Sequence, residues 1–318
     1  MRIGSTLSLF VIASIGLGTS FVGIETGLAA VPPVLFAAFR FDFAAVLLLG
    51  FVAYRYEIWT PQSRNDVFAI VASGVFVVAI NNGLLFVGQQ YTTSGAAAVT
   101  YGLLPVISPL FAFLLLSDRV SAIDFGGILV GLVGVLILVS PTPGSLGDST
   151  YGQSLIAIAA LSIALGSVAT KRFKPTLAML PLSAWAMALG AVLLHITSVA
   201  IGETTSIAWT PETLTAVVYV GIPGTAVAYG AYFLLIAQAG PVHANLVAYT
   251  VPAVATVSGW LVLGEVLSAT TVIGFFIILA GFVVIQRSAV RELRDNYRRP
   301  PGYEETATTD RTEFVTDD

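Results

Sequence analysis

Long apolar segments recur along the whole chain, each about 20 residues in length. A helix of that length crosses the roughly 30 Å hydrocarbon core of a bilayer. Only 10% of the residues are charged, whereas soluble domains carry about 25%. Most of the protein surface must therefore face lipid, and we expect an all-α, polytopic membrane protein.

Turn signals divide the apolar sequence into ten predicted transmembrane helices. Their ranges are 5–27, 33–54, 67–88, 94–116, 122–140, 152–171, 179–201, 212–236, 241–263 and 268–286. If the N-terminus lies in the cytoplasm, every basic loop residue is cytoplasmic, and the opposite loops carry acidic residues only. This is the positive-inside pattern, so we expect a multi-pass protein of the cell membrane with both termini in the cytoplasm.

Residues 287–318 follow the last span as a charged segment with few apolar residues. They offer too little apolar area to offset the entropy of ordering, so we expect a largely disordered cytoplasmic tail. The chain has no cysteine, which excludes disulfides and thiolate metal sites. The basic residues follow the topology and form no stripe for nucleic acid, and we expect no cofactor.

Glycine and proline positions recur at an offset of 147 residues. The matched pairs include Pro105 with Pro252, Gly127 with Gly274, and Gly134 with Gly281. This recurrence predicts two five-helix copies, 1–140 and 152–286, joined by an external linker, 141–151. Because five is odd, the second copy starts from the opposite side of the membrane. Such an inverted repeat is typical of alternating access around one central site.

Three segments resemble the EamA-type transporters of the drug/metabolite transporter superfamily. They are GTSFVGIETGLAAVPPVLFAAFRFDFAAVLLL, YTTSGAAAVTYGLLPVISPLFAFLLLSDRVS and AGPVHANLVAYTVPAVATVSGWLVLGEVLS, and the resemblance covers about residues 5–286. Its most specific marks are the arginine of the second span and two prolines, each followed 13 residues later by an acidic residue, as in Pro105 to Asp118 and Pro252 to Glu265. The resemblance implies a ten-helix transporter of small metabolites, commonly amino acids. Asp118 departs from the glutamate usual at its position, and an aromatic residue usual early in the first span is absent.

Arg40 and Asp42 lie inside the second span, where one charge costs about 3 kcal/mol or more. They are separated by roughly 200° around a helix, so one can face a cavity while the other contacts a neighbouring helix. Arg40 either binds a substrate carboxylate or forms an anchoring ion pair with Glu25 or Asp42, and the resemblance favours the structural role. Asp42 is the preferred candidate for proton coupling. Glu25 is a second candidate and the expected counter-charge of Arg40.

Five further polar or aromatic residues are expected to bind cargo near the middle of the bundle: Asn81, Asn82, Tyr101, Tyr229 and Tyr249. Arg40, also a cargo-binding candidate, is expected toward the external side with Asp42 and Glu25. For the asparagines, hydrogen bonding between helices is an equal alternative. Pro105 and Pro252 free backbone carbonyls and are predicted gating joints, with a packing kink as the alternative. His195 is interpreted as a satisfied interior histidine rather than a proton relay.

These features predict a secondary active transporter that moves a small amphipathic metabolite, such as an amino acid, by alternating access. Export is the expected direction, protons or another ion the coupling species, and a monomer in the lipid bilayer the expected state. The alternative is a membrane-embedded enzyme, or a non-transport membrane protein, acting on lipid-soluble substrates. The sequence has no nucleotide-binding glycine loop and no His-Glu-x-x-His motif, so we expect no enzyme and no metal site.

Overall fold

The computed structural model describes residues 3–116, 121–139, 148–203, 206–245, 247–266 and 268–285. All regular secondary structure in these ranges is helical, as predicted. The predicted tail 287–318, Asp118 and most of the predicted linker 141–151 lie outside the described residues.

The helices follow the predicted spans closely. They are α1 (Ile3–Leu28), α2 (Pro33–Arg55), α3 (Arg64–Ala72), α4 (Asn81–Gln89), α5 (Ser94–Thr100), α6 (Leu104–Leu116), α7 (Ala122–Val139), α8 (Asp148–Arg172), α9 (Met179–Ala200), α10 (Pro211–Gly221), α11 (Ala228–Asn245), α12 (Val247–Leu263) and α13 (Ala269–Ile285). Three short segments connect some of them: the π-helices η1 (Ser73–Ile80) and η3 (Ile222–Val227), and the 3₁₀ turn η2 (Tyr101–Leu103).

One predicted boundary is wrong. A break was expected between 236 and 241, where Gly240 and Pro241 signal a turn, yet α11 continues to Asn245. Proline removes one helical hydrogen bond, and in a bundle neighbouring groups can compensate for that loss without ending the helix. The helix therefore extends beyond the eighth predicted span, whose apolar stretch itself ends at Ile236 as expected.

Seven helical stretches among the described residues are long and apolar enough to cross a membrane. Three shorter apolar helices accompany them, Phe125–Ile137, Thr250–Leu263 and Ala269–Val284. Each of the ten predicted spans falls on one of these stretches. A polytopic membrane fold follows, while the full count of ten crossings stays a prediction.

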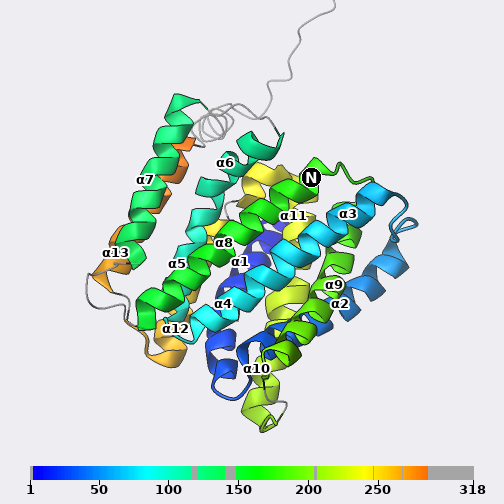
Figure 1. Cartoon of the computed structure of the whole chain (residues 1–318), viewed down its shortest axis with the longest axis horizontal. Helices are drawn as coiled ribbons and strands as arrows, with labels where there is room; N and C mark the ends of the chain where they lie inside the picture. The colour runs from blue at the N-terminus through cyan, green and yellow to red at the C-terminus, as the bar shows by residue number, and fades with distance from the viewer. Residues whose placement is uncertain are drawn as a thin grey trace, which may run out of the picture. The chain divides into compact units, whose positions relative to one another are not determined.

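Helices from the first half of the chain pack against helices from the second half. Figure 1 shows α7 beside α13, and α2 likewise packs along α9 and α1 along α12. The main core includes Phe36, Phe86 and Leu194, which are almost completely enclosed. The hydrophobic interior is thus built from residues of both halves of the sequence.

Glycines allow α7 and α13 to approach closely in a reciprocal manner. A Cβ atom on Gly134 would lie 2.9 Å from the carbonyl oxygen of Gly274, and one on Gly281 would lie 2.6 Å from that of Gly127. Both distances are too short for a side chain, so the backbones can meet only where glycine is present. Gly127 and Gly274 are one pair that recurs at an offset of 147 residues, and Gly134 and Gly281 are the other. Each contact joins a glycine of one pair to a glycine of the other pair.

The two π-helical segments also lie at related positions. η1 ends at Ile80 and η3 at Val227, which are 147 residues apart. At each segment a polar side chain bonds to a carbonyl five residues earlier. Asn82 Nδ2, in α4 just after η1, reaches the Val77 carbonyl oxygen at 3.3 Å, and Thr225 Oγ1, within η3, donates to that of Val220 at 2.6 Å. π-helical turns occur frequently at functional sites.

Candidate functional site

Arg40 lies on α2 with only 4% of its surface exposed. Its Nε donates a hydrogen bond of 2.6 Å to Thr225 Oγ1 in η3. The guanidinium carbon lies 5.5 Å from the ring centre of Phe41 and 5.8 Å from that of Phe86. Contacts at this distance are attractive because the face of an aromatic ring is negative.

The positive charge of Arg40 has no carboxylate partner among the described residues, where the one ion pair joins Asp42 and His195. Within the same part of the chain, its single hydrogen bond uses Nε and leaves both Nη groups without an acceptor. Among the described residues, Gln89 Oε1 is the one polar side-chain atom that has neither a hydrogen-bond partner nor accessible surface. The Nη groups of Arg40 have no partner either, so they must retain some accessible surface. A buried, unpaired guanidinium that can still be reached is suited to bind an anion.

Two tyrosines adjoin this guanidinium. Tyr101, in η2, and Tyr229, in α11, both interact electrostatically with Arg40 and are half-buried. The Tyr101 hydroxyl donates a 2.6 Å hydrogen bond to Oδ1 of Asn81, the first residue of α4. The structure therefore brings together four predicted cargo-binding residues, which are contributed by four separate helical elements.

The other predicted site residues lie elsewhere or outside the described side chains. Nδ2 of Asn82 is buried and donates to Val78 of its own helix at 2.9 Å, so this group supports the π-helical turn. Tyr249 is on α12, but its side chain is outside the described ones. Pro105 opens α6 directly after the η2 turn, whereas Pro252 is buried inside a continuous α12.

Asp42 faces away from Arg40, as the helical spacing predicted. Its Oδ2 lies 2.8 Å from Nε2 of His195 on α9. The two side chains are 43% and 39% exposed, respectively, so the pair lies at the surface of the bundle. The expectation that Arg40 pairs with Asp42 or Glu25 is wrong for the described residues, and His195 has a charged partner instead of an enclosed interior site.

Glu25, near the end of α1, contacts the side chain of Gln89 at the end of α4, with 3.4 Å between Gln89 Nε2 and Glu25 Oε2. The same Nε2 donates to the carbonyl oxygen of Phe21 at 2.5 Å. Gln89 is completely buried. Neither Gln89 nor Thr225 was among the predicted site residues.

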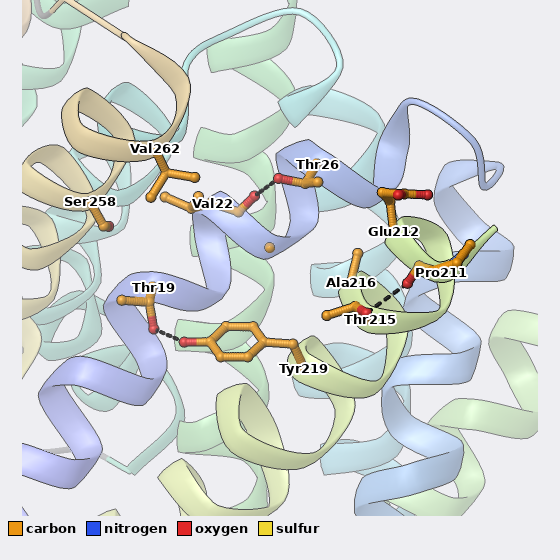
Figure 2. A pocket seen from close by; sticks show the side chains of 11 residues that line it. Thr19, Val22, Thr26, Pro211, Glu212, Thr215, Ala216, Tyr219, Ser258 and Val262 are labelled. Atoms are coloured by element: carbon orange, nitrogen blue, oxygen red, sulfur yellow. Dashed lines mark hydrogen bonds between the residues drawn. The ribbon is translucent and has the colours of Figure 1, made fainter.

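A separate groove of about 500 Å³ lies between α1, α10 and α12. Figure 2 shows Thr19 and Tyr219 meeting across it, with 2.5 Å between their oxygens, and Glu212 near Pro211 at one end. None of the predicted cargo-binding residues lines this groove. It is therefore distinct from the cluster around Arg40.

Comparison with known proteins identifies the family. The profile of the EamA-like transporter family matches residues 4–140 and 150–287. This chain belongs to the EamA-like transporter family. The uncharacterized inner membrane transporter YedA of Escherichia coli (strain K12) is 30% identical over 283 residues, which are 89% of either chain. The uncharacterized transporter YoaV of Bacillus subtilis (strain 168) is 23% identical over 83% of this chain and 90% of its own.

A solved structure titled "Crystal structure of protein" is also similar to this EamA-like transporter. It has a TM-score of 0.62 and 21% sequence identity, and the match covers 92% of this chain and 99% of the other. This similarity shows the fold. The family and its transporter relatives show that the chain is a multi-pass membrane transporter.

Proposed function

We propose that this EamA-like transporter is a secondary active transporter of a small amphipathic metabolite that carries a carboxylate, such as an amino acid. The observation that carries the proposal is the buried guanidinium of Arg40, whose Nη groups have no acceptor among the described residues. A cargo carboxylate would supply the missing acceptors through a paired, charge-assisted contact.

The surroundings of Arg40 favour cargo that is only partly polar. Phe86 and Phe41 form an aromatic wall beside the guanidinium, and the half-buried rings of Tyr101 and Tyr229 lie next to it. Few polar groups on a mainly apolar lining are typical of sites for small organic ligands. We assign cargo contacts to Arg40, Tyr101, Tyr229 and Asn81, and we retain Asn82 and Tyr249 as further candidates.

Alternating access between two inverted repeats, 1–140 and 152–286, is the proposed mechanism. Three observations support it: the family profile matches two ranges of similar length, the α7–α13 glycine contacts are reciprocal, and the two π-helical segments are 147 residues apart. Helix breaks at cavities are a feature of transporters with such repeats. The η2 turn before Pro105 is a proposed gating joint, and Pro252 is its proposed counterpart.

In this proposal the protein is a monomer of the cell membrane, with ten spans and both termini in the cytoplasm, and export is the expected direction. Protons or another ion supply the driving force. Asp42 and Glu25 are the candidate coupling residues, and Asp42→Asn tests the first of them. The loss of pH-dependent transport by this variant would support a coupling role, whereas unchanged pH dependence would remove Asp42 from it.

Transport by purified protein tests the proposal. Proteoliposomes are loaded with a labelled mixture of amino acids, and efflux is measured under an imposed proton gradient. Wild-type protein is expected to release at least one amino acid, and Arg40→Gln is expected to abolish that release. Arg55→Gln changes an exposed arginine in the last turn of α2, outside the Arg40 cluster, and serves as the matched control. Equal efflux from wild-type and Arg40→Gln vesicles would contradict the proposal.

A further inference from the structure

The side-chain amide of Gln89, the last residue of α4, is only half satisfied. The side chain is completely buried, and Nε2 donates to the Phe21 carbonyl oxygen at 2.5 Å. Oε1 is enclosed and has no hydrogen-bond partner among the described residues. A buried acceptor of this kind costs free energy unless some state of the protein supplies a donor.

Rotating the Gln89 amide by a half turn, so that Oε1 and Nε2 exchange places, does not satisfy both atoms. A carbonyl oxygen can only accept, so the group that faces Phe21 must be the Nε2 donor. Oε1 is therefore fixed as the atom that needs a donor. A titratable side chain, that of Glu25, lies beside this amide: it is one helical turn from Phe21, and its Oε2 is 3.4 Å from Gln89 Nε2.

A carboxylate has no proton to donate, whereas a carboxylic acid has one. Glu25 is only partly buried, so water can exchange protons with it. Within the described part of the chain, no Lys, Arg or His pairs with Glu25. The protonated form of Glu25 would thus supply the donor that Gln89 Oε1 lacks.

A charged group near Glu25 in the described part of the chain is also acidic. Glu265, which follows α12, interacts electrostatically with Glu25, and Glu212 on α10 lies at the groove that Thr26 lines. Glu265 is held in place by the start of α5, since it accepts bonds of 3.0 Å from the Ser94 N–H and 2.7 Å from the Ser94 hydroxyl. The one donor to Glu25 among the described residues is the Gln89 amide at 3.4 Å, a longer contact than those that Glu265 accepts from Ser94. A proton on Glu25 relieves the repulsion between the two carboxylates.

We propose that Glu25 and Gln89 form a proton-binding site that couples proton movement to cargo transport. The inference rests on the proposed secondary transport. When the site holds a proton, that proton has come from water on one side of the membrane and forms the O–H bond of Glu25, which donates to Gln89 Oε1. When the site has released the proton to water on the other side, the Glu25 carboxylate accepts from Gln89 Nε2.

This proton site is connected to the cargo cluster through one residue. The carbonyl of Phe21 binds Gln89, and its ring packs edge-on against Tyr101, with 6.0 Å between the ring centres. Tyr101 in turn bonds to Asn81 and adjoins Arg40. A change in the Gln89 amide can therefore shift the Tyr101 ring through direct contact.

Infrared difference spectroscopy tests the site without any cargo. Full-length protein in lipid is titrated with acid and base, and the carboxylic-acid C=O band is recorded. We expect a pH-dependent band that disappears in Glu25→Gln and persists in Glu212→Gln, the matched control. In Gln89→Leu the band should remain but shift, because the Glu25 acid loses its acceptor.

A band that survives in Glu25→Gln, or that does not move in Gln89→Leu, would overturn the proposal. So would a band that responds to sodium ions at constant pH, since this would indicate a cation site. If Glu25→Gln fails to fold, the shift in Gln89→Leu decides alone. Because no cargo is present, a negative result here leaves the cargo experiment with Arg40→Gln unaffected.

Discussion

Glu203, which follows α9, binds the backbone at the start of α2: its Oε1 accepts a 2.9 Å hydrogen bond from the N–H of Val34. Its Oε2 also accepts bonds from the N–H of Leu35 and the hydroxyl of Ser198. A carboxylate at this position satisfies N–H groups that have no partner within their helix, and it complements the helix dipole.

We predict that Glu203→Ala lowers the free energy of unfolding by about 1–2 kcal/mol, the range found for lost helix caps. Thermal unfolding of the purified protein in detergent measures the change. Glu57→Ala, which removes an exposed carboxylate in the loop after α2, is the control and should have little effect. Equal melting temperatures for the two variants would show that the Glu203 cap does not stabilise the α2–α9 pair.

Asp66, in the first turn of α3, has a similar role at the start of α9. It is fully buried and accepts bonds from the backbone N–H groups of Thr176 at 2.7 Å and Leu177 at 2.9 Å, just before α9. It also accepts from the N–H groups of Gln62 and Ser63. Asp66 thus connects the start of α3 to the start of α9, and Glu203 connects the end of α9 to the start of α2.

Because Asp66 is buried, we expect its substitution to destabilise the fold more than substitution of Glu203. Asp66→Asn places an NH₂ group against backbone donors, and we predict a loss of about 2–3 kcal/mol. Chemical denaturation monitored by tryptophan fluorescence provides the measurement, with wild-type protein and Glu203→Ala compared in parallel. A smaller loss for Asp66→Asn than for Glu203→Ala would contradict this account.

The α7–α13 contact gives a third prediction. Gly281→Ala would place a methyl group 2.6 Å from the Gly127 carbonyl oxygen, and the helices must separate to accept it. We expect a loss of about 1–3 kcal/mol, as for other overpacked sites. Gly126→Ala, on α7 with open space at its Cβ, is the matched control. Equal melting temperatures for Gly281→Ala and Gly126→Ala would show that the helices are not closely packed at Gly281.

Tyr101→Phe removes the hydroxyl that donates to Asn81 and leaves Asn81 Oδ1 without that donor. We predict weaker cargo binding by about 1 kcal/mol, or roughly fivefold, with the fold preserved. Titration calorimetry with the transported amino acid measures the affinity, and Tyr54→Phe, on an exposed tyrosine, is the control. Unchanged affinity in Tyr101→Phe would remove the hydroxyl from the cargo site.

The sequence singled out the members of the Arg40 cluster one by one because polar groups are rare inside apolar spans. Arg40, Asn81, Tyr101 and Tyr229 each stand out in this way, and the family resemblance drew attention to the arginine. Their contact partners could not be predicted, because nothing in the local sequence indicates which distant helix each residue faces. Thr225 escaped notice since a single hydroxyl is common in such helices.

Gln89 was missed for a different reason: the third span was expected to end at residue 88, so Gln89 was placed outside the membrane. Asp42 and His195 were each identified as unusual, but their pairing depends on how α2 packs against α9. The π-helical segments have no periodic signature of their own. Local pattern therefore determined the helices and the candidate residues, while helix packing determined which of them meet.

The central claim is that Arg40 binds the carboxylate of the cargo, and ligand-induced thermal stabilisation tests it most directly. Purified protein is screened against amino acids and against the corresponding amides, which lack the carboxylate. We predict that at least one amino acid raises the melting temperature, that its amide does not, and that Arg40→Gln abolishes the increase. Equal stabilisation by an amino acid and its amide, or stabilisation that persists in Arg40→Gln, would contradict the claim.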